Sequence, residues 1–447
     1  MSHSRRSFLK FSGLVSASAL TLDSLTAKAF NQTFTNEMHS NTDVYTANAQ
    51  STYWGVYAIH QGLTFEDVTY FNILRGKTEN LTYEVVDSQN RKLQYVVISE
   101  YSVSGASQRM DKIRVNSLKV GESYRLRIVN SANKVLDERI FKSLDTKKKN
   151  PKLGIASCMN DSFDNACVKM WKTFQGYKPD LIFLIGDTCY SDNRNDKTQL
   201  GYWGRYAETR SKIGIFRERE LTPILAVWDD HDFGDNNADG SSKIKYFMKD
   251  LFTAFWLYPE HTYYRRGVGV AQVLKIFGHR FHLMDSRFHR NASEQWGKEQ
   301  EDFLFQHLTQ DKTPSWIMNG SQFFGGYLKK DAFEYAQPAN FKQLCAKLAK
   351  VQAPVAFVSG DVHFSETMKI EPQVLGYQTF EITSSAMHSF TVMGNHNRKK
   401  NPRRLDATSK HNFNIITLDN TQGEFKFDLT CSADNKVIYQ RSFAIKK

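Results

Sequence analysis

Side chains able to bind metal ions stand directly after short apolar runs of the chain. Each run has the length and composition of a strand buried in an α/β protein. Open α/β sheets place their sites at the carboxyl ends of such strands, so these side chains are expected to meet. The runs and the residues that follow them are Leu153–Ser157 with Cys158, Leu181–Gly186 with Asp187, Tyr190 and Asp192, Ile224–Trp228 with Asp229, Asp230, His231 and Asp232, and Val355–Gly360 with Asp361 and His363.

The mixture of ligand types predicts a site for more than one metal ion. Anionic groups that converge on one sheet edge repel one another unless cations neutralise them. Carboxylate, imidazole, phenolate and thiolate together suit a binuclear site that can hold a hard trivalent metal such as iron. Taken singly, an acidic residue after a strand is usually a turn residue or a helix cap. Such supporting roles are expected for Asp192, Asp229 and Asp232, with metal binding as the less favoured alternative.

The part of the chain that must position these residues begins after Pro151 and alternates short apolar strands with helical stripes. This order of elements is typical of an α/β fold, and the pattern returns to strands towards the C-terminus. Further strands are predicted at Val273–Phe277, Phe281–Asp285 and Trp316–Asn319, and helices at 163–175, 244–257, 298–309 and 339–350.

An all-β sandwich domain is predicted for residues 40–146, ahead of the α/β part. Its runs are short and alternate apolar with polar side chains, as in Tyr124–Ile128, with turn residues such as Ser131–Asn133 between them. Strands at this spacing favour an antiparallel sandwich of about a hundred residues. The charged stretch Lys147–Pro151 is typical of a solvated linker.

The composition describes a globular protein and says little about its partners. The 447 residues are 40% hydrophobic and 24% charged, which excludes a disordered chain. A net charge of +12 weakly favours anionic ligands or surfaces. The densest basic run, Arg398–Arg404, has no interleaved aromatic residues, so a solvated loop is expected and no nucleic-acid partner is predicted.

Residues 1–29 resemble a twin-arginine (Tat) signal peptide. Paired arginines at Arg5 and Arg6 precede Phe-Leu-Lys and a mildly apolar stretch, and Ala27-Lys-Ala29 offers a cleavage site. No other segment approaches the ~18–20 apolar residues of a membrane span. We therefore expect a protein without a stable membrane span, exported by the Tat translocase to the periplasm or the exterior. Five cysteines leave at least one unpaired there.

The motif series resembles the PhoD-like (alkaline phosphatase D) family of the calcineurin-like metallophosphatases. The resemblance runs in order over about 153–390, and two positions depart from the family pattern. Met159 follows the cysteine where a small polar residue is expected, and His388 is the nearest substitute for a closing Gly-His-x-His motif. The matching motifs are Ser157-Cys158, Gly-Asp187-Thr-Cys-Tyr190-Ser-Asp192, Trp228-Asp-Asp-His-Asp-Phe-Gly-Asp-Asn236, Met284-Asp-Ser-Arg287, Gly360-Asp-Val-His-Phe364 and Thr383-Ser-Ser385.

The resemblance implies a fold and a set of metal ions. Residues 152–447 would form the four-layer α/β/β/α sandwich of a metallophosphatase, behind the all-β domain. The implied metals are Fe³⁺ with Ca²⁺ partners, in a binuclear or trinuclear site. Asp187 would bridge the iron to the second metal, whose identity stays open because oxygen donors do not separate calcium from magnesium or manganese. The iron ligands would be Cys158, Asp187, Tyr190 and Asp361, with Asp230 and His363 as further metal ligands and Asn236 near the calcium or the phosphate.

Two residues are expected to touch the substrate. His231 directly follows a presumed ligand and would act as general acid or hydrogen-bond donor towards the leaving oxygen. Arg287, at the end of a predicted strand, could hold a phosphate with two parallel hydrogen bonds. A surface salt bridge is an equal alternative for Arg287.

These features predict an exported, metal-dependent phosphoric ester hydrolase. A hydroxide bound to the metals would attack phosphorus, and a phosphomonoester is the expected substrate. The alternative within the class is a phosphodiester, such as a phospholipid or a wall polymer, because the same chemistry serves both. The rival from another class is a non-catalytic protein that binds anionic surfaces and whose metal site has decayed. Against it, every expected ligand except the last of the motif series is present, and a decayed site would be expected to lose several.

Overall fold

The computed structural model describes residues 54–256, 269–325, 332–397, 401–421 and 424–447. The predicted Tat signal at 1–29 lies outside the described residues, as do residues 40–53 of the predicted sandwich domain. The described residues belong to one compact unit of the chain. None of the helices in the described ranges is both long and apolar enough to cross a membrane.

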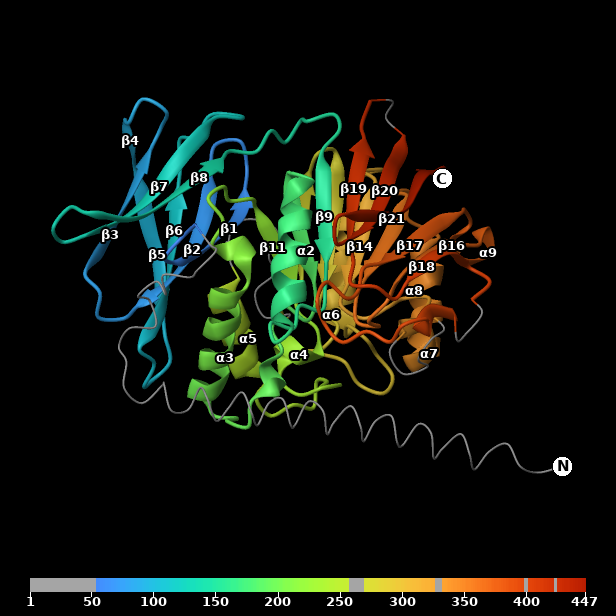
Figure 1. Ribbon diagram of the computed structural model, residues 1–447. Coiled ribbons are helices and arrows are strands. Elements are labelled where there is room, and N and C mark those ends of the chain that lie inside the picture. Colours follow the sequence, from blue (N-terminus) through green and yellow to red (C-terminus); the bar gives the residue numbers. More distant parts are fainter. Residues whose placement is uncertain (1–53, 257–268, 326–331, 398–400, 422–423) are drawn as a thin grey trace. The chain divides into compact units, whose positions relative to one another are not determined.

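Two antiparallel sheets form the first part of the fold, drawn in blue to teal in Figure 1. Side chains alternate between the faces of each strand, so Tyr124–Ile128 buries every second residue, as the sequence predicts. The buried faces meet where the rings of Phe71 and Phe141 lie 4.9 Å apart. One sheet has the order β1 (Ala58–Thr64), β2 (Thr69–Gly76), β6 (Gln108–Val115), β5 (Tyr95–Tyr101), and the other β4 (Lys92–Leu93), β3 (Leu81–Val86), β7 (Ser123–Asn130), β8 (Val135–Lys142).

Two mixed sheets form the second part of the fold, and the predicted buried strands are all among their members. Strands β9, β10 and β11 run parallel in one sheet, and β13, β14, β15 and β17 run parallel in the other. The six-stranded order is β11 (Ile224–Val227), β10 (Leu181–Ile185), β9 (Lys152–Ala156), β19 (Phe413–Asp419), β20 (Phe425–Ala433), β21 (Lys436–Ile445). The seven-stranded order is β12 (Gln272–Ile276), β13 (His279–Met284), β14 (Ser315–Asn319), β15 (Val355–Ser359), β17 (Thr379–Thr383), β16 (Ser365–Ile370), β18 (Arg404–Thr408).

Aromatic side chains join these two sheets face to face. Phe183 of β10 lies 5.0 Å from Phe281 of β13, and Trp316 of β14 lies 4.9 Å from Phe427 of β20, measured between ring centroids. Because the central strands are covered on both faces, they read as continuous apolar runs and not as alternating ones. This is why their ends could be located in the sequence.

Helices pack against the sheets and fix the loops between them. Helix α2 (Asp164–Gly176) buries the stripe of Cys167, Met170, Trp171 and Phe174. The four predicted helices are confirmed as α2 (Asp164–Gly176), α5 (Lys245–Phe255), α6 (Lys298–Leu308) and α8 (Pro338–Leu348). The sequence did not predict α3 (Gln199–Lys212) or the short helices η1 (Ser191–Asn193), η2 (Gly214–Phe216), α4 (Asp230–Phe233), α7 (Phe333–Ala336), α9 (Pro372–Leu375) and η3 (Asn395–Asn397).

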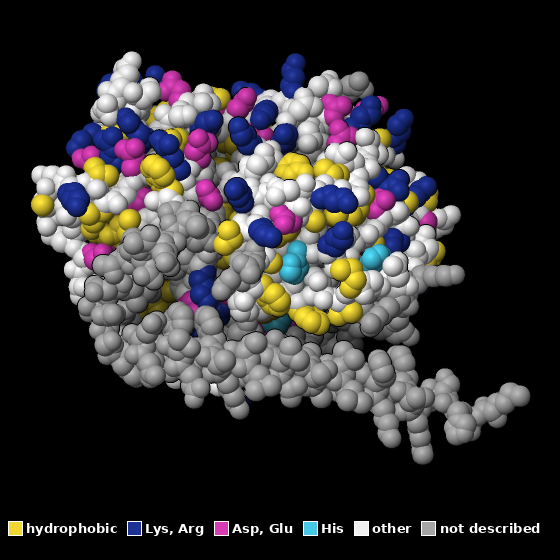
Figure 2. All heavy atoms as spheres, viewed as in Figure 1, with side chains coloured by type: hydrophobic (Ala, Val, Ile, Leu, Met, Phe, Trp, Pro, Cys, Tyr) yellow, Lys and Arg dark blue, Asp and Glu magenta, His cyan; other side chains and the backbone are white. Residues whose placement is uncertain are grey.

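The sandwich strands contact the α/β part through buried polar groups. His60 of β1 hydrogen-bonds the carbonyl oxygen of Ile224 at 2.9 Å, and the Asn72 amide of β2 donates to the carbonyl oxygen of Phe255 at 2.9 Å. On the face of the molecule shown in Figure 2, basic and acidic side chains are interspersed. The positive charge of the chain is therefore not segregated from acidic groups on that face.

Candidate metal centre

The ends of strands from both mixed sheets meet at one point. β9 and β10 lead into loops that carry Cys158 and Asp187, and β15 of the other sheet leads into the loop that carries Asp361 and His363. Gly360 makes this approach possible, because a Cβ there would lie 2.6 Å from the carbonyl oxygen at the end of β10. Side chains from loops more than 200 residues apart in sequence therefore share one space, in which Cys158 and Asp187 are buried and Asp361 and His363 are partly exposed.

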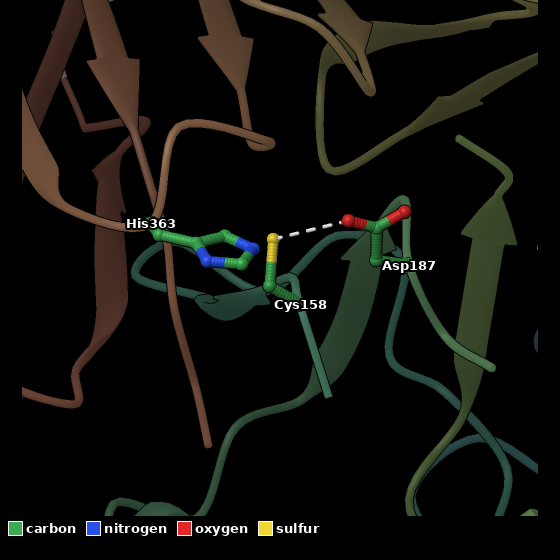
Figure 3. A group of neighbouring side chains, drawn as sticks. All are labelled: Cys158, Asp187 and His363. Atoms are coloured by element: carbon green, nitrogen blue, oxygen red, sulfur yellow. Dashed lines mark hydrogen bonds between the residues drawn. The ribbon is translucent and has the colours of Figure 1, made fainter. Parts of the chain in front are cut away.

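Three overlapping groups of side chains in the described ranges are close enough to hold metal ions. Within each group the ligand atoms lie within 4.8 Å of one another. Figure 3 shows the first group, with the thiol of Cys158 between the imidazole and the carboxylate. Because Asp187 and Asp230 each belong to two groups, the groups form one continuous cluster. They are Cys158, Asp187 and His363; Asp187, Asp230 and His231; and Asp229, Asp230 and Asp361.

The backbone takes an unusual conformation at four of these residues. Cys158, Asp187, Asp361 and His363 have φ angles of 55°, 52°, 70° and 54°. A non-glycine residue in this left-handed region costs on the order of 1–3 kcal/mol and persists only where its surroundings hold it. Two main-chain hydrogen bonds contribute here, from Cys158 N to Gly186 O at 3.3 Å and from Met159 N to Asp187 O at 2.9 Å. The loops are thereby tied to one another and turn their side chains inward.

The cluster holds more buried negative charge than its hydrogen bonds compensate. Oδ1 of Asp187 and Oδ2 of Asp229 are buried and have no hydrogen-bond partner. Burial raises the pKa of Asp187 well above its usual range, and the carboxylates of Asp230, Asp229 and Asp232 raise it further. An unpaired carboxylate taken out of water costs several kcal/mol. These oxygen atoms therefore fit the role of ligands to cations.

Cys158 and Tyr190 are buried and supported by serine hydroxyls. The Cys158 thiol lies 3.4 Å from Asp187 Oδ2 and accepts a hydrogen bond from Ser385 Oγ at 3.1 Å. The Tyr190 hydroxyl donates to Ser389 Oγ at 2.8 Å and lies 3.2 Å from Nε2 of His363. Burial raises the pKa of both groups well above their usual values. Both therefore keep their protons until a cation displaces them.

His363 presents a neutral imidazole to the cluster. Burial lowers its pKa to about 4, so at neutral pH only one of its two ring nitrogens carries a proton. Its backbone N–H donates to Ser385 Oγ at 2.9 Å, which links this loop to the serine beside the Cys158 thiol. A neutral imidazole is the form that binds metals.

His231 is held as a cation. Its Nδ1 lies 2.8 Å from Asp192 Oδ1, and its ring stacks on Tyr190 with centroids 4.2 Å apart. Although burial lowers the pKa of His231, the carboxylates of Asp187, Asp192 and Asp230 raise it to about 10. The imidazolium is therefore in position to donate a proton at the cluster.

Arg287 forms ion pairs with two carboxylates of the protein. Its Nε donates to Asp229 Oδ1 at 2.5 Å, its Nη2 lies 3.7 Å from Asp230 Oδ1, and Nη2 also donates to Ser321 Oγ at 3.2 Å. The arginine is 2% exposed, so the alternative of a surface salt bridge is wrong and the ion pair is a buried one. Despite burial, Arg287 and His231 hold the pKa of Asp230 below its usual range.

Two candidates from the sequence adjoin the cluster and differ from the ligand candidates described above. Asn236 is exposed, whereas the backbone N–H of its neighbour Asn237 donates to Asp230 Oδ2 at 2.6 Å. Both ring nitrogens of His388 have partners: Trp171 Nε1 donates to Nε2 at 3.0 Å, and Nδ1 lies 3.0 Å from the carbonyl oxygen of Asn160. His388 therefore does not complete the ligand set.

Asp232 organises the loops around the cluster. Its carboxylate accepts hydrogen bonds from the backbone N–H groups of Thr188, Cys189 and Asp229 at 3.1, 2.9 and 3.0 Å. Burial raises its pKa to about 7, which those hydrogen bonds oppose. The spacing of Asp229 and Asp232 is that of a capping box at the start of α4, a signal present in the sequence. Ser389, which accepts from Tyr190, had no comparable signal.

Comparison with known proteins reveals the fold. Neither protein-family models nor curated protein sequences match the chain. A solved structure described as the structure of PhoD aligns over 89% of this chain and 90% of its own, with a TM-score of 0.67 and 16% sequence identity. A structure of the vertebrate membrane protein Astrotactin-2 aligns over 38% of this chain and 31% of its own, with a TM-score of 0.17 and 9% identity, which is too low to indicate kinship. The chain thus has a PhoD-like fold that carries a β domain.

Proposed function

We propose that this protein is a metal-dependent phosphoesterase that hydrolyses phosphomonoesters. The observation that carries the proposal is the cluster in which the Asp187 carboxylate lies close to Cys158, His363 and Asp230 and has an oxygen atom without a hydrogen-bond partner. The PhoD-like fold supports a phosphatase-type hydrolase. The four-layer α/β/β/α arrangement of residues 152–447 is part of the same proposal.

The proposed metals are Fe³⁺ and Ca²⁺. Cys158 and Tyr190 offer a thiolate and a phenolate, which lower the charge of a trivalent ion, and Asp230 and Asp361 offer the oxygen atoms that calcium prefers. Asp187 lies between the two ligand groups and is the bridging candidate. When bound, such ions activate water as a nucleophile and draw off the charge that grows on the phosphoryl oxygens.

The residues of the chain supply proton transfer and orientation. His231 holds a proton on the side of the cluster occupied by Asp187 and Asp230, so it can protonate the leaving oxygen. Asp192 fixes the orientation of the His231 ring through Nδ1. Arg287 pairs with Asp229 and Asp230 and lowers the pKa of Asp230, so we propose that it orders these carboxylates in place of the phosphate contact expected from the sequence.

Export by the Tat pathway is proposed on the sequence of residues 1–29 alone. The paired arginines, the weakly apolar stretch and the small residues at the cleavage site support it. The Tat translocase carries folded proteins, so a site that must select its metals could be loaded before export. The proposed location of the mature protein is the periplasm or the exterior.

Elemental analysis combined with phosphoesterase assays tests the proposed function. Protein produced from the full chain should contain iron, show a visible absorption band from phenolate or thiolate bound to Fe³⁺, and release phosphate from a chromogenic monoester. A chromogenic diester run in parallel distinguishes the alternative substrate class. Colourless protein that holds no metal and hydrolyses neither ester would contradict the proposal and favour a surface-binding protein.

A further inference from the structure

A buried arginine on helix α3 connects two of the loops that converge on the metal cluster. Arg205 is 4% exposed, and its Nε donates to the carbonyl oxygen of Tyr190 at 3.1 Å. Its Nη1 donates to Asp161 Oδ2 at 2.9 Å, and Nη2 hydrogen-bonds Asp161 Oδ1 as well. Nη1 also lies 3.4 Å from Glu208 Oε2 on the same helix. The guanidinium thus has partners along its whole edge.

The two partners of Arg205 belong to different ligand-bearing loops. Asp161 stands three residues after Cys158 in the loop that follows β9, and it is 1% exposed. Tyr190 stands in the loop that follows β10 and carries the phenolic ligand candidate. Neither Arg205 nor Asp161 belongs to any of the three metal-competent groups. Their hydrogen bonds act on the spacing of the loops.

We propose that Arg205 and Asp161 are positioning residues that set the relative placement of Cys158 and Tyr190 for metal binding. The inference rests on the proposed metal centre. A guanidinium can do this because its planar fork fixes a carboxylate with two parallel hydrogen bonds, while Nε remains for a third partner. A lysine keeps the charge and loses that geometry. Outer-shell partners of metal ligands contribute about 10–100-fold to metal affinity.

Helix α3 itself offers a matched control. Arg210 is also 4% exposed, and its guanidinium lies 4.0 Å from the Phe216 ring centroid and 4.2 Å from that of Trp256. It donates to the carbonyl oxygen of Phe255 at 2.8 Å, which belongs to α5 and not to a ligand-bearing loop. Arg210→Lys therefore perturbs a buried arginine of the same helix without touching the contacts of Arg205.

The test compares Arg205→Lys, Asp161→Asn and Arg210→Lys in the full chain produced with iron and calcium. Bound metal is measured by elemental analysis during titration with a chelator, and the visible band is recorded. We expect the first two variants to release metal at about tenfold lower chelator concentration and to show a shifted band. Arg210→Lys should lower the melting temperature while it retains metal within twofold of the wild type.

The outcomes separate this inference from the proposed function. Equal metal retention in all three variants would overturn the positioning role and leave the metal centre intact. A wild-type protein that binds no metal would overturn the metal centre itself. Where Arg205→Lys does not fold, Asp161→Asn decides the question, because the amide keeps the shape of the side chain and removes its charge.

Discussion

The Nδ1 atom of His231 lies 2.8 Å from Asp192 Oδ1 and 2.9 Å from Asp192 Oδ2. The two residues belong to the segments that follow β11 and β10, which are neighbouring parallel strands. The carboxylate orients the ring and stabilises its protonated form. Because a carboxylate holds Nδ1, the other ring nitrogen is the one that can serve the reaction. His231 is thus a proton donor whose pKa depends on Asp192.

Replacing Asp192 with asparagine should shift the pH profile of hydrolysis. A general acid works while it is protonated, so activity falls as the pH rises through its pKa. The Asp192 carboxylate raises the pKa of His231, and its removal should move the alkaline limb of kcat/KM to lower pH by about one to two units. Asp235→Asn, at an exposed acid paired with Lys197, is the control and should leave the limb in place. An unchanged limb in Asp192→Asn would show that His231 is not the donor.

Replacing Arg287 with methionine should cost stability more than phosphate affinity. Removal of the cation leaves Asp229 and Asp230 as buried, uncompensated charges. This should lower the free energy of unfolding of the metal-free protein by about 3–5 kcal/mol. The measurement is denaturant unfolding of metal-free wild type and variant. Lys275→Met, which removes a half-exposed ion pair with Asp311, should cost less than about 1 kcal/mol.

A direct phosphate contact by Arg287 would give the opposite pattern. Inhibition by inorganic phosphate would then weaken strongly in Arg287→Met while the free energy of unfolding stayed near that of the wild type. The buried geometry of Arg287 opposes this outcome, because its guanidinium already serves protein oxygen atoms.

The sequence located the cluster of possible metal ligands because the relevant strands are buried on both faces. Continuous apolar runs such as Leu181–Ile185 are easy to recognise, and the ligand candidate follows each run within a few residues. The convergence of Cys158, Asp187, Asp230 and Asp361 follows from the rule that strand ends of α/β sheets gather functional groups. Strand ends and ligand types are local properties, and local properties can be read from a sequence.

Helix α3 escaped prediction for a physical reason. Its buried side chains include Arg205 and Arg210, and charged residues are counted as exposed when an apolar stripe is sought. Gly201 and Gly204 lower its intrinsic helix propensity as well. The buried ion pairs of Arg287 were missed for a related reason. Its partners Asp229 and Asp230 lie nearly 60 residues earlier in the chain. Pairing of buried charges over such separations has no local signature.

Replacing Asp187 with asparagine should abolish hydrolysis and leave the fold intact. An amide cannot bridge two cations as a carboxylate does, so we expect kcat/KM for a chromogenic phosphoester to fall about 10³-fold, the equivalent of several kcal/mol. The metal-free variant should unfold at a temperature no lower than that of metal-free wild type, because the change removes a buried carboxylate whose Oδ1 atom lacks a partner. Turnover within tenfold of wild type would contradict the bridging role.

Removal of metal should destabilise the protein more at pH 9 than at pH 7. Burial raises the pKa of Asp187 well above its usual range and that of Asp232 to about 7, so metal-free folded protein holds protons that the unfolded chain has released. The stability that comes from these protons is present below the unfolded pKa and is lost as the pH rises through the folded pKa. His231, whose pKa is raised to about 10, changes stability in the same direction.

Calorimetry with and without a chelator at the two pH values measures this effect. A metal ion present at about 1,000 times its Kd adds about 4 kcal/mol to the free energy of unfolding. The loss of this free energy on chelation should be larger at pH 9, where the carboxylates repel one another most. Asp187→Asn is the matched control: it removes one of the repelling charges, so its metal-free form should lose less stability between pH 7 and pH 9 than metal-free wild type. A chelation effect that is equal at both pH values, or absent, would show that cations do not neutralise this cluster.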